Sequence, residues 1–417
     1  MSLLAEQFRK KVESFNDYAM KCEKEADVGY STGFLNFDFR NSSVIHVKNE
    51  ERGLDYSYYS IGITDGSMTT VIGRTGCGKS TWVTQVSANM VRPFKTACIF
   101  QDTIEAGMQD SRLEVLTGFT GEELQSRLIT RNTGINSENF YERIKLIHDM
   151  RVENREAYLY DTGLLDYRGE KIYKMEPCVY ILDSLALLRP KSLTEEDNMS
   201  GQMAVTSAAK MNTEIIRRII PFLKSANINL FIINHILKNV NLNQYQATKA
   251  QVQYLKQDER CPGGDTALYL ANNLIRLDDS KLKPEVFGID GSLITMTLLK
   301  SRTNKAGQSV TLVYNQSCGY DADLSLFVML KDAKRIGVGG AWMWVGDHKD
   351  MKFQQKTLKK KLKEDPEFRK VFIAESLDVL KAMCDADATA DREESNVVSS
   401  EIADMMSTLK IEHSKAA

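Results

Sequence analysis

The chain has 417 residues, of which 42% are hydrophobic and 26% are charged, with 54 Lys and Arg against 56 Asp and Glu. This length allows about two or three domains, and the composition excludes a wholly disordered chain, collagen and a coiled coil. The net charge of -2 excludes a general attraction for polyanions, so DNA binding would require local basic patches.

Three features of the whole chain predict a cytoplasmic protein. No apolar run approaches the roughly 18 residues of a membrane-spanning helix, so no membrane partner is expected. Residues 1–11 lack the apolar centre and cleavage site of a secretory signal. The seven cysteines are dispersed without a CxxC pair, which predicts reduced thiols and no zinc site.

Residues 1–28 are expected to form a separate N-terminal element. Apolar residues recur there at spacings of three and four, as on one face of an amphipathic helix. They are Leu4, Phe8, Val12, Phe15, Ala19 and Cys22. Because a linker-like stretch at 28–33 follows, this face must pack on the protein's own core or on another subunit.

Residues 29–336 are expected to form one α/β core. Between 69 and 279, short apolar strand patterns alternate with helical patterns, which indicates βαβ units and a mostly parallel sheet covered on both faces. The polar stretch 128–173 predicts little beyond a helix near 140–147 and is interpreted as an insertion. Further strand patterns occur at 273–277, 293–299 and 310–314.

Residues 337–417 are expected to form a small C-terminal domain that ends in an acidic tail. A glycine-rich turn at 337–340 opens this part of the chain. Asp365 is a candidate N-cap for a helix over 366–383. The lysine-rich stretch 356–363 and the acidic stretch after residue 384 are both interpreted as solvated surface.

The strongest motif is GRTGCGKS at residues 73–80, which fits GxxxxGK[ST] between a strand pattern and a helix pattern. Glycines let the backbone N–H groups surround a phosphate, and the helix N-terminus adds a favourable dipole. Lys79 would reach the outer phosphates, and the Ser80 hydroxyl would bind magnesium. The expected nucleotide-binding residues are Gly73, Arg74, Thr75, Gly76, Cys77, Gly78, Lys79, Ser80 and Thr81.

Polar residues at the ends of three other strand patterns are candidates for hydrolytic chemistry. Asp183 is expected to hold magnesium together with Ser80. Glu105 is favoured as the residue that orients the attacking water, and Asp102 is the alternative. His235 is expected to contact the γ-phosphate and to report its presence, although such a histidine can also be purely structural.

Residues 238–262 are rich in Asn and Gln and poor in apolar residues. Such a stretch has little reason to pack, which predicts a mobile loop that binds phosphodiester backbones. An ordinary exposed loop is the alternative. The residues expected to contact DNA are Lys238, Lys249, Lys256 and Arg260.

Together these motifs resemble the RecA-type recombinases, in particular those of T-even-like phages. The resemblance runs discontinuously over 31–336 and includes the segment 31–38, the magnesium strand at 182–185 and Ile-Asn-His at 233–235. It implies a RecA-type P-loop ATPase core, an N-terminal oligomerisation helix and a small C-terminal domain. The chain is longer than the family pattern over 39–53 and 118–174, and assigning the catalytic glutamate to Glu105 requires a one-residue gap.

Further site residues follow only from this resemblance. Lys300 and Arg302, in the segment 300–303, would reach ATP bound in the neighbouring subunit. A first DNA-binding loop would lie within 189–203 and include Arg189 and Lys191. The second DNA-binding loop would close at Gly263 and Gly264.

The resemblance implies an ATP- and Mg²⁺-dependent strand-exchange protein of the host-cell cytoplasm. It would form helical filaments on single-stranded DNA and pair that strand with homologous duplex, with single-strand-binding and mediator proteins as further partners. A hexameric DNA helicase on the same core is the main alternative, although only about 28 residues precede the core-like segment. A nucleotide-regulated assembly ATPase is the third class.

Overall fold

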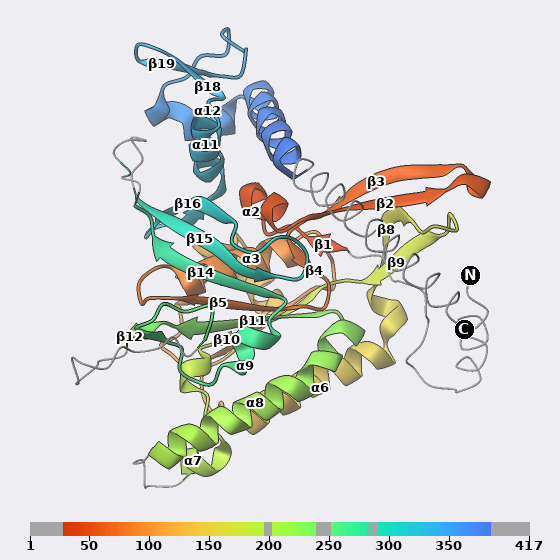
Figure 1. The fold of residues 1–417 in the computed structure, drawn as a ribbon, viewed down its shortest axis with the longest axis vertical. Helices are drawn as coiled ribbons and strands as arrows, with labels where there is room; N and C mark the ends of the chain where they lie inside the picture. Colours follow the sequence, from red (N-terminus) through yellow and green to blue (C-terminus); the bar gives the residue numbers. More distant parts are fainter. Residues whose placement is uncertain (1–27, 196–201, 239–251, 282–283, 285–290, 385–417) are drawn as a thin grey trace, which may run out of the picture.

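The computed structural model describes residues 28–195, 202–238, 252–281, 284 and 291–384, and its centre is a nine-stranded sheet (Figure 1). The strands are β5 Met68–Gly73, β6 Ile99–Thr103, β7 Leu128–Arg131, β10 Cys178–Asp183, β11 Ile228–His235, β14 Asn273–Asp279, β15 Ser292–Ser301, β16 Ser309–Asn315 and β17 Gly319–Asp321. Their order is β17-β16-β15-β14-β5-β11-β10-β6-β7. The strands from β14 to β7 are mutually parallel, and the other three are antiparallel, so the expected mostly parallel α/β sheet is confirmed.

The central strands are buried on both faces because helices cover each side of the sheet. Every residue of β5 and β10 is buried, which explains their continuous apolar sequences. One face packs against α3 (Lys79–Val91), and the other packs against α6 (Ser137–Glu153) and α8 (Gln202–Ser225). In Figure 1, α6 and α8 run side by side below the sheet.

The strand order creates a switch point at β5. The chain passes from β5 through α3 to β6 across β11 and β10, whereas β14 pairs with β5 on its other side. The register places Gly73 opposite both His235 and Leu277. In open α/β sheets ligands bind outside the carboxyl ends of the strands at such a point, so this edge is the place to look for a site.

Two segments that the sequence left undescribed form hairpins. One is β2 (Ser43–Asn49) with β3 (Leu54–Ser60), and the other is β8 (Leu159–Leu165) with β9 (Lys171–Met175). The stretch 128–173 is therefore more structured than expected, because it also supplies β7 to the sheet and the 17-residue helix α6. Half-exposed strands with polar residues have weak hydrophobic patterns, which is why sequence reasoning missed them.

The C-terminal part has its own hydrophobic cluster, which Phe39 of the core also joins. It contains α11 (Ala322–Asp332), β18 (Ile336–Gly339), β19 (Trp342–Val345), α12 (Leu358–Glu364) and a helix over 366–384. Its cluster includes Phe327, Phe353 and Phe372, so α11 packs with this part, and α11 also contacts β16 of the central sheet. The expected N-cap is confirmed, because the Phe368 N–H donates to the Asp365 carboxylate at 3.0 Å.

Several expectations fall on residues outside the described ranges. These are the N-terminal helix, the acidic stretch after residue 384, the part of the first DNA-binding loop at 196–201, and Lys249. Within the ranges given above, no helix is both long and apolar enough to cross a membrane.

A buried carboxylate ahead of the phosphate loop makes stability dependent on pH. Asp38, in α2 (Leu35–Arg40), is fully buried and accepts hydrogen bonds from Ser31 Oγ at 2.6 Å and from the Thr32 N–H at 2.9 Å. Burial raises the pKa of Asp38 from 3.8 to about 6, and these hydrogen bonds offset only part of that effect.

The raised pKa predicts a stability contribution that is lost as the pH rises. The folded state holds the Asp38 proton more tightly than the unfolded state, so the contribution is present below pH 3.8 and disappears through pH 6. We expect the difference in unfolding free energy between wild type and Asp38→Asn to fall by about 2 kcal/mol between pH 4 and pH 8. Urea titrations measure this difference, and parallel curves would contradict the assignment.

Candidate nucleotide-binding site

The loop between β5 and α3 has the geometry of a phosphate-binding loop. Gly76 and Gly78 have φ values of 86° and 76°, which side-chain-bearing residues rarely adopt. Gly78 is the N-cap of α3 and provides no side-chain cap, so the first N–H groups of a 13-residue helix are available to an anion.

Lys79 lies inside this loop and needs an anion. Its side chain is buried, with the residue 5% exposed, and Nζ donates to the Arg74 carbonyl oxygen at 2.8 Å. One hydrogen bond to a neutral carbonyl oxygen does not fully offset the free energy that a buried ammonium loses when it leaves water. A phosphate entering the loop would supply the missing negative charge.

Ser80 and Asp183 form a pair of oxygen ligands suited to Mg²⁺. Ser80 Oγ donates to Asp183 Oδ2 at 2.5 Å. The other oxygen, Asp183 Oδ1, is buried and finds no hydrogen-bond donor among the described residues. Burial is the largest cause of the raised pKa of Asp183, and the nearby Glu105 carboxylate adds to it. Mg²⁺ commonly uses one or two protein oxygens together with phosphate and water, so these residues fit the ion.

Glu105 lies between two polar side chains at the same edge of the sheet. Ser184 Oγ donates to Glu105 Oε1 at 2.7 Å, and His235 Nε2 lies 2.6 Å from the same oxygen. Burial raises the pKa of Glu105, but the hydrogen bonds from Ser184 and His235 and nearby positive charge outweigh it, and the net pKa is lowered. Glu105 is therefore an ionised, oriented carboxylate beside the phosphate loop.

Asp102, the alternative to Glu105, lies in a different environment. It is fully buried and accepts a hydrogen bond from Tyr180 Oη at 2.5 Å. It also forms ion pairs with Arg143 and, at 3.4 Å, with Arg131. These partners already bind the Asp102 carboxylate beneath α6. The geometry therefore favours Glu105 as the group that orients water.

Lys300 and Arg302 lie at the opposite edge of the sheet from the phosphate loop. Lys300 pairs with Leu274 near the start of β14, whereas Leu277 pairs with Gly73 at its other end. Lys300 Nζ donates to the Tyr269 carbonyl oxygen. The Arg302 N–H donates to the Asn272 carbonyl oxygen at 3.0 Å, beside the start of β5. One chain therefore does not bring these cations to its own phosphate loop.

The candidate DNA-binding residues that the structure describes lie near the strand ends that carry Asp183 and His235. Arg189 and Lys191 are exposed beyond β10, and Lys191 begins α7 (Lys191–Glu195). Gly263 and Gly264 have φ values of 89° and 101°, and a Cβ atom on Gly263 would lie 2.7 Å from the Leu185 carbonyl oxygen. The close approach to Leu185 therefore requires glycine at position 263.

The stretch 238–262 is less exposed than expected. Val252, Leu255 and Cys261 are buried, and β13 (Glu259–Arg260) pairs with β12 (Leu237–Lys238). The expectation that few apolar residues would leave this stretch unpacked is wrong for its second half, because those three side chains join the core. Lys238, Lys256 and Arg260 nevertheless remain exposed.

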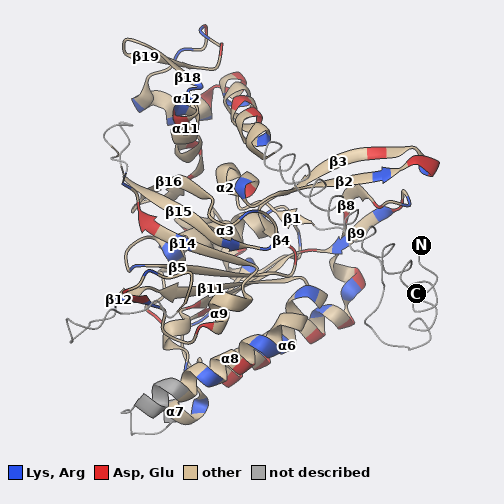
Figure 2. Ribbon diagram, viewed as in Figure 1, with Lys and Arg blue, Asp and Glu red and all other residues tan. Residues whose placement is uncertain are grey.

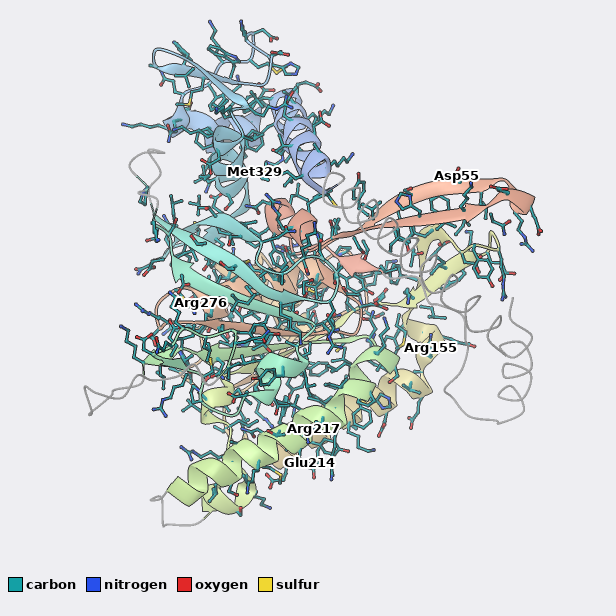
Figure 3. All side chains as sticks on the ribbon, viewed as in Figure 1. Asp55, Arg155, Glu214, Arg217, Arg276 and Met329 are labelled. Carbon is teal, nitrogen blue, oxygen red and sulfur yellow. The ribbon has the colours of Figure 1, made fainter. Side chains whose placement is uncertain are left out.

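A buried ion pair anchors this stretch to the sheet and was missed in the sequence. Arg276 of β14 is 5% exposed and donates to both oxygens of Glu259 at 2.6 and 2.8 Å. Asp278 accepts from Arg276 Nε at 2.6 Å. A charged residue within a buried strand pattern was the available signal, since such a residue needs buried partners. Figure 3 shows Arg276 on the sheet, away from the β2–β3 hairpin that carries Asp55.

Two tyrosines that support the phosphate loop were also missed. Tyr320 Oη donates to the Cys77 carbonyl oxygen at 2.7 Å, and a Cβ atom on Gly78 would lie 3.0 Å from the Tyr314 ring. The two rings are 4.9 Å apart. Tyr314 ends the strand expected at 310–314, but the pairing of β16 with β17, which brings both rings beside the loop, was not expected from the sequence.

Comparison with protein-family models gives no match, and no curated protein sequence matches the chain significantly. Function therefore has to be inferred from the site. Its phosphate-binding loop, two magnesium-suited oxygens and oriented carboxylate suit the hydrolysis of a nucleoside triphosphate.

Proposed function

We propose that the chain is an ATP-dependent DNA strand-exchange protein of the RecA type, which assembles as a helical filament on single-stranded DNA. The observation that supports this proposal best is the division of a hydrolytic site between two edges of one sheet. Lys79 and Asp183 lie at one edge, and Lys300 and Arg302 lie near the other. A head-to-tail assembly joins opposite edges of successive copies.

In this proposal each residue has a distinct role in hydrolysis. Lys79 neutralises the outer phosphates, and Ser80 and Asp183 hold the magnesium ion that screens them. Glu105 orients the attacking water and accepts its proton. Lys300 and Arg302 of the preceding copy stabilise the charge that develops on the transferred phosphoryl group, so turnover requires assembly.

DNA would be coupled to this site through the ends of the two loops. The Asn234 side chain donates to the Pro262 carbonyl oxygen at 2.7 Å, directly before His235, and His235 contacts Glu105. Gly263 packs on Leu185, which follows Asp183 by two residues. When the exposed basic residues nearby bind DNA phosphates, a change in their position would therefore be passed to Glu105 and Asp183 through only a few contacts. The basic residues are Arg189, Lys191, Lys238, Lys256 and Arg260.

Electron microscopy with single-stranded DNA and ATP tests the proposal. Open helical filaments, together with exchange of strands between that DNA and a homologous duplex, are the expected result. A composite nucleotide site would serve a hexameric helicase equally well, so closed six-membered rings with unwinding activity would favour the helicase. ATP hydrolysis that ignores DNA, without either assembly, would favour a nucleotide-regulated assembly ATPase.

A mixing experiment tests the shared site. Lys79→Ala and the double variant Lys300→Ala/Arg302→Ala each lack one half of it, so each alone is expected to be nearly inactive on single-stranded DNA. In mixtures one orientation of the mixed interface recovers both halves, and ATPase activity should return with a maximum near equal amounts. Co-assembly of the two variants without any recovery would show that Lys300 and Arg302 do not act on the neighbouring nucleotide.

A further inference from the structure

Thr103 and Asp183 end two neighbouring strands of the sheet and lie on the same face of it. β6 pairs with β10 in parallel, and Thr103 is the register partner of Asp183. Side chains of register partners lie on one face of a sheet, and the contact of Asp183 with Ser80 places α3 on this face. The Ile104 N–H donates to the Asp183 carbonyl oxygen at 2.7 Å, so the two strand ends stay paired beyond this position. Thr103 therefore lies beside the oxygens that suit Mg²⁺.

Gln101 and Thr103 form a buried polar pair at the end of β6. Gln101 Nε2 donates to Thr103 Oγ1 at 3.0 Å, and the two residues are 5% and 7% exposed. A threonine hydroxyl has two lone pairs, so Thr103 Oγ1 can accept one more hydrogen bond. The second amide atom, Gln101 Oε1, is buried and finds no donor in the part of the chain that the structure describes. The pair therefore has unused acceptors next to Asp183.

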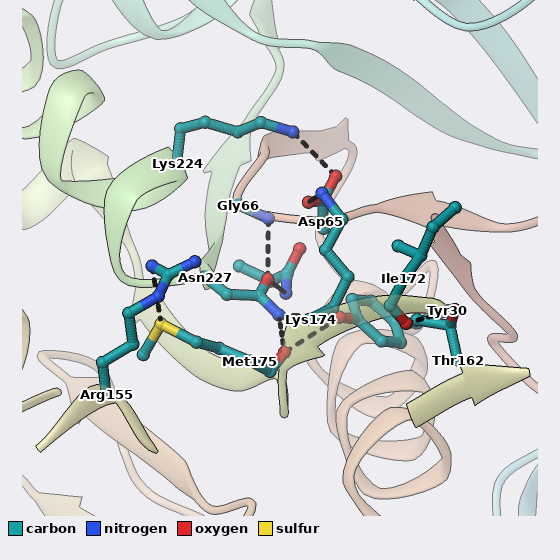
Figure 4. A network of polar contacts seen from close by, with 11 residues as sticks. Tyr30, Asp65, Gly66, Arg155, Thr162, Ile172, Lys174, Met175, Lys224 and Asn227 are labelled. Carbon is teal, nitrogen blue, oxygen red and sulfur yellow. Dashed lines mark hydrogen bonds and ion pairs between the residues drawn. The ribbon is translucent and has the colours of Figure 1, made fainter. Parts of the chain in front are cut away.

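Asp183 differs from a buried carboxylate that is fully paired within the chain. Both oxygens of Asp65, shortly before β5, have a cation beside them (Figure 4). Lys174 Nζ lies 3.1 Å from Asp65 Oδ2, and Lys224 Nζ lies 2.8 Å from Asp65 Oδ1. Asp183 Oδ1 has no donor among the described residues, and β11, which pairs with β10, contains no Lys or Arg and is tan in Figure 2. A donor for this oxygen has to come from outside the chain.

The spacing between Thr103 and Asp183 suits a water molecule as that donor. Thr103 Oγ1 and Asp183 Oδ1 belong to register partners but form no direct hydrogen bond, since no described residue donates to Asp183 Oδ1. A water molecule commonly bridges two polar atoms that are too far apart for direct contact. It carries two protons, and both oxygens can accept one. Mg²⁺ usually keeps several of its waters and binds few protein oxygens directly.

We propose that Thr103, held by Gln101, and Asp183 Oδ1 together bind one water molecule of the hydrated magnesium ion. This inference rests on the magnesium site of the proposed function and adds to it two residues that orient the hydration shell. The water donates one proton to Asp183 Oδ1 and the other to Thr103 Oγ1. Gln101 fixes the Thr103 hydroxyl by donating to it. Thr103 and Gln101 are therefore positioning residues that act on the ion through water.

Thr103→Val tests this water site, because valine keeps the shape of threonine and lacks its hydroxyl. The dissociation constant of a non-hydrolysable ATP analogue is measured in Mg²⁺ and in EDTA, and the ratio of the two constants reports how far the ion strengthens binding. We expect Thr103→Val to lower this ratio about tenfold and to leave the constant in EDTA unchanged. Thr103→Ser keeps a hydroxyl and should restore the ratio. Thr130→Val, at an exposed position of β7, is the matched control.

Gln101→Met is a second variant that leaves Thr103 intact. Methionine has a similar length and shape but cannot donate to the Thr103 hydroxyl, so the ratio should fall here too. This variant decides the question if Thr103→Val does not fold. A ratio equal to that of wild type would then show that the Gln101–Thr103 pair does not act on the ion.

The binding measurement distinguishes failure of the water site from failure of the proposed function. It needs neither DNA nor assembly, so its result does not depend on strand exchange. If Mg²⁺ strengthens binding equally in wild type and in Thr103→Val, Thr103 holds no water of the ion, although the nucleotide site stands. If Thr103→Val weakens binding equally in Mg²⁺ and in EDTA, its role is purely structural and the water site is excluded. If Mg²⁺ does not strengthen binding to wild type, the magnesium site itself fails and the water site fails with it.

Discussion

Lys79→Ala and Asp183→Asn are each expected to lower ATP turnover by at least about a hundredfold. Lys79 supplies the buried positive charge of the phosphate loop, and Asp183 supplies the carboxylate beside Ser80. Loss of one such electrostatic contact to a transferring phosphoryl group costs ~3 kcal/mol or more of transition-state stabilisation. Phosphate release on single-stranded DNA at saturating Mg²⁺ and ATP measures the effect.

Asp183→Asn should lower turnover without lowering the stability of the folded protein, which separates loss of the site from loss of the fold. Because burial raises the pKa of Asp183, its ionised form is disfavoured in the folded protein at neutral pH. Asp183→Asn removes that charge and leaves an oxygen to accept from Ser80, so its melting temperature without ligand should rise. Addition of Mg²⁺ and ATP should raise the melting temperature of wild type more than that of this variant. Wild-type turnover in either variant would contradict the site assignment, and Asp347→Asn is an exposed control.

The glycine-rich loop between β5 and α3 was predictable because all of its determinants are local. Eight adjacent residues, 73–80, contain the glycines, the lysine and the hydroxyl, and the flanking patterns indicate a strand and a helix. The position of Asp183 could also be predicted, since a carboxylate at the end of a buried strand pattern is distinctive. Continuous apolar strand patterns likewise predicted the parallel sheet, whose central strands are buried throughout.

What the sequence could not reveal depends on partners that are distant in the chain. Arg276 has a defined position only through Glu259, and Tyr320 supports the loop through a bond to Cys77, which lies 243 residues away. The arrangement of the hairpins β2–β3 and β8–β9 depends on contacts between segments that are 109 or more residues apart. A one-dimensional pattern does not contain these pairings, and half-exposed strands provide no continuous apolar signal.

The choice between Asp102 and Glu105 shows the same limit at short range. Both follow the same strand pattern and differ by three positions, so sequence spacing alone left the choice open. The structure separates them by environment. Asp102 lies beneath α6 with arginine and tyrosine partners, and Glu105 lies beyond the strand beside Ser184 and His235.

Glu105→Gln is expected to retain binding of ATP and DNA while lowering the hydrolysis rate by about a hundredfold or more. Glutamine keeps the size of the side chain and can still accept from Ser184, but it cannot take a proton from water. Assembled protein should therefore persist after ATP is added, and single-turnover hydrolysis measures the chemical step directly. Because the pKa of Glu105 is lowered, ionisation of this group should not limit wild-type turnover anywhere in the neutral range.

Asp102→Asn is the matched comparison, since it makes the same chemical change three residues away. It breaks ion pairs of a fully buried carboxylate with Arg131 and Arg143, so we expect a loss of about 3 kcal/mol or more of unfolding free energy. The hydrolysis rate per folded molecule should stay near that of wild type. If instead Asp102→Asn slowed hydrolysis without unfolding the protein, and Glu105→Gln turned over normally, Asp102 would be the residue that orients water. The path from His235 through Glu105 to the nucleotide would then be excluded as the link between DNA and hydrolysis.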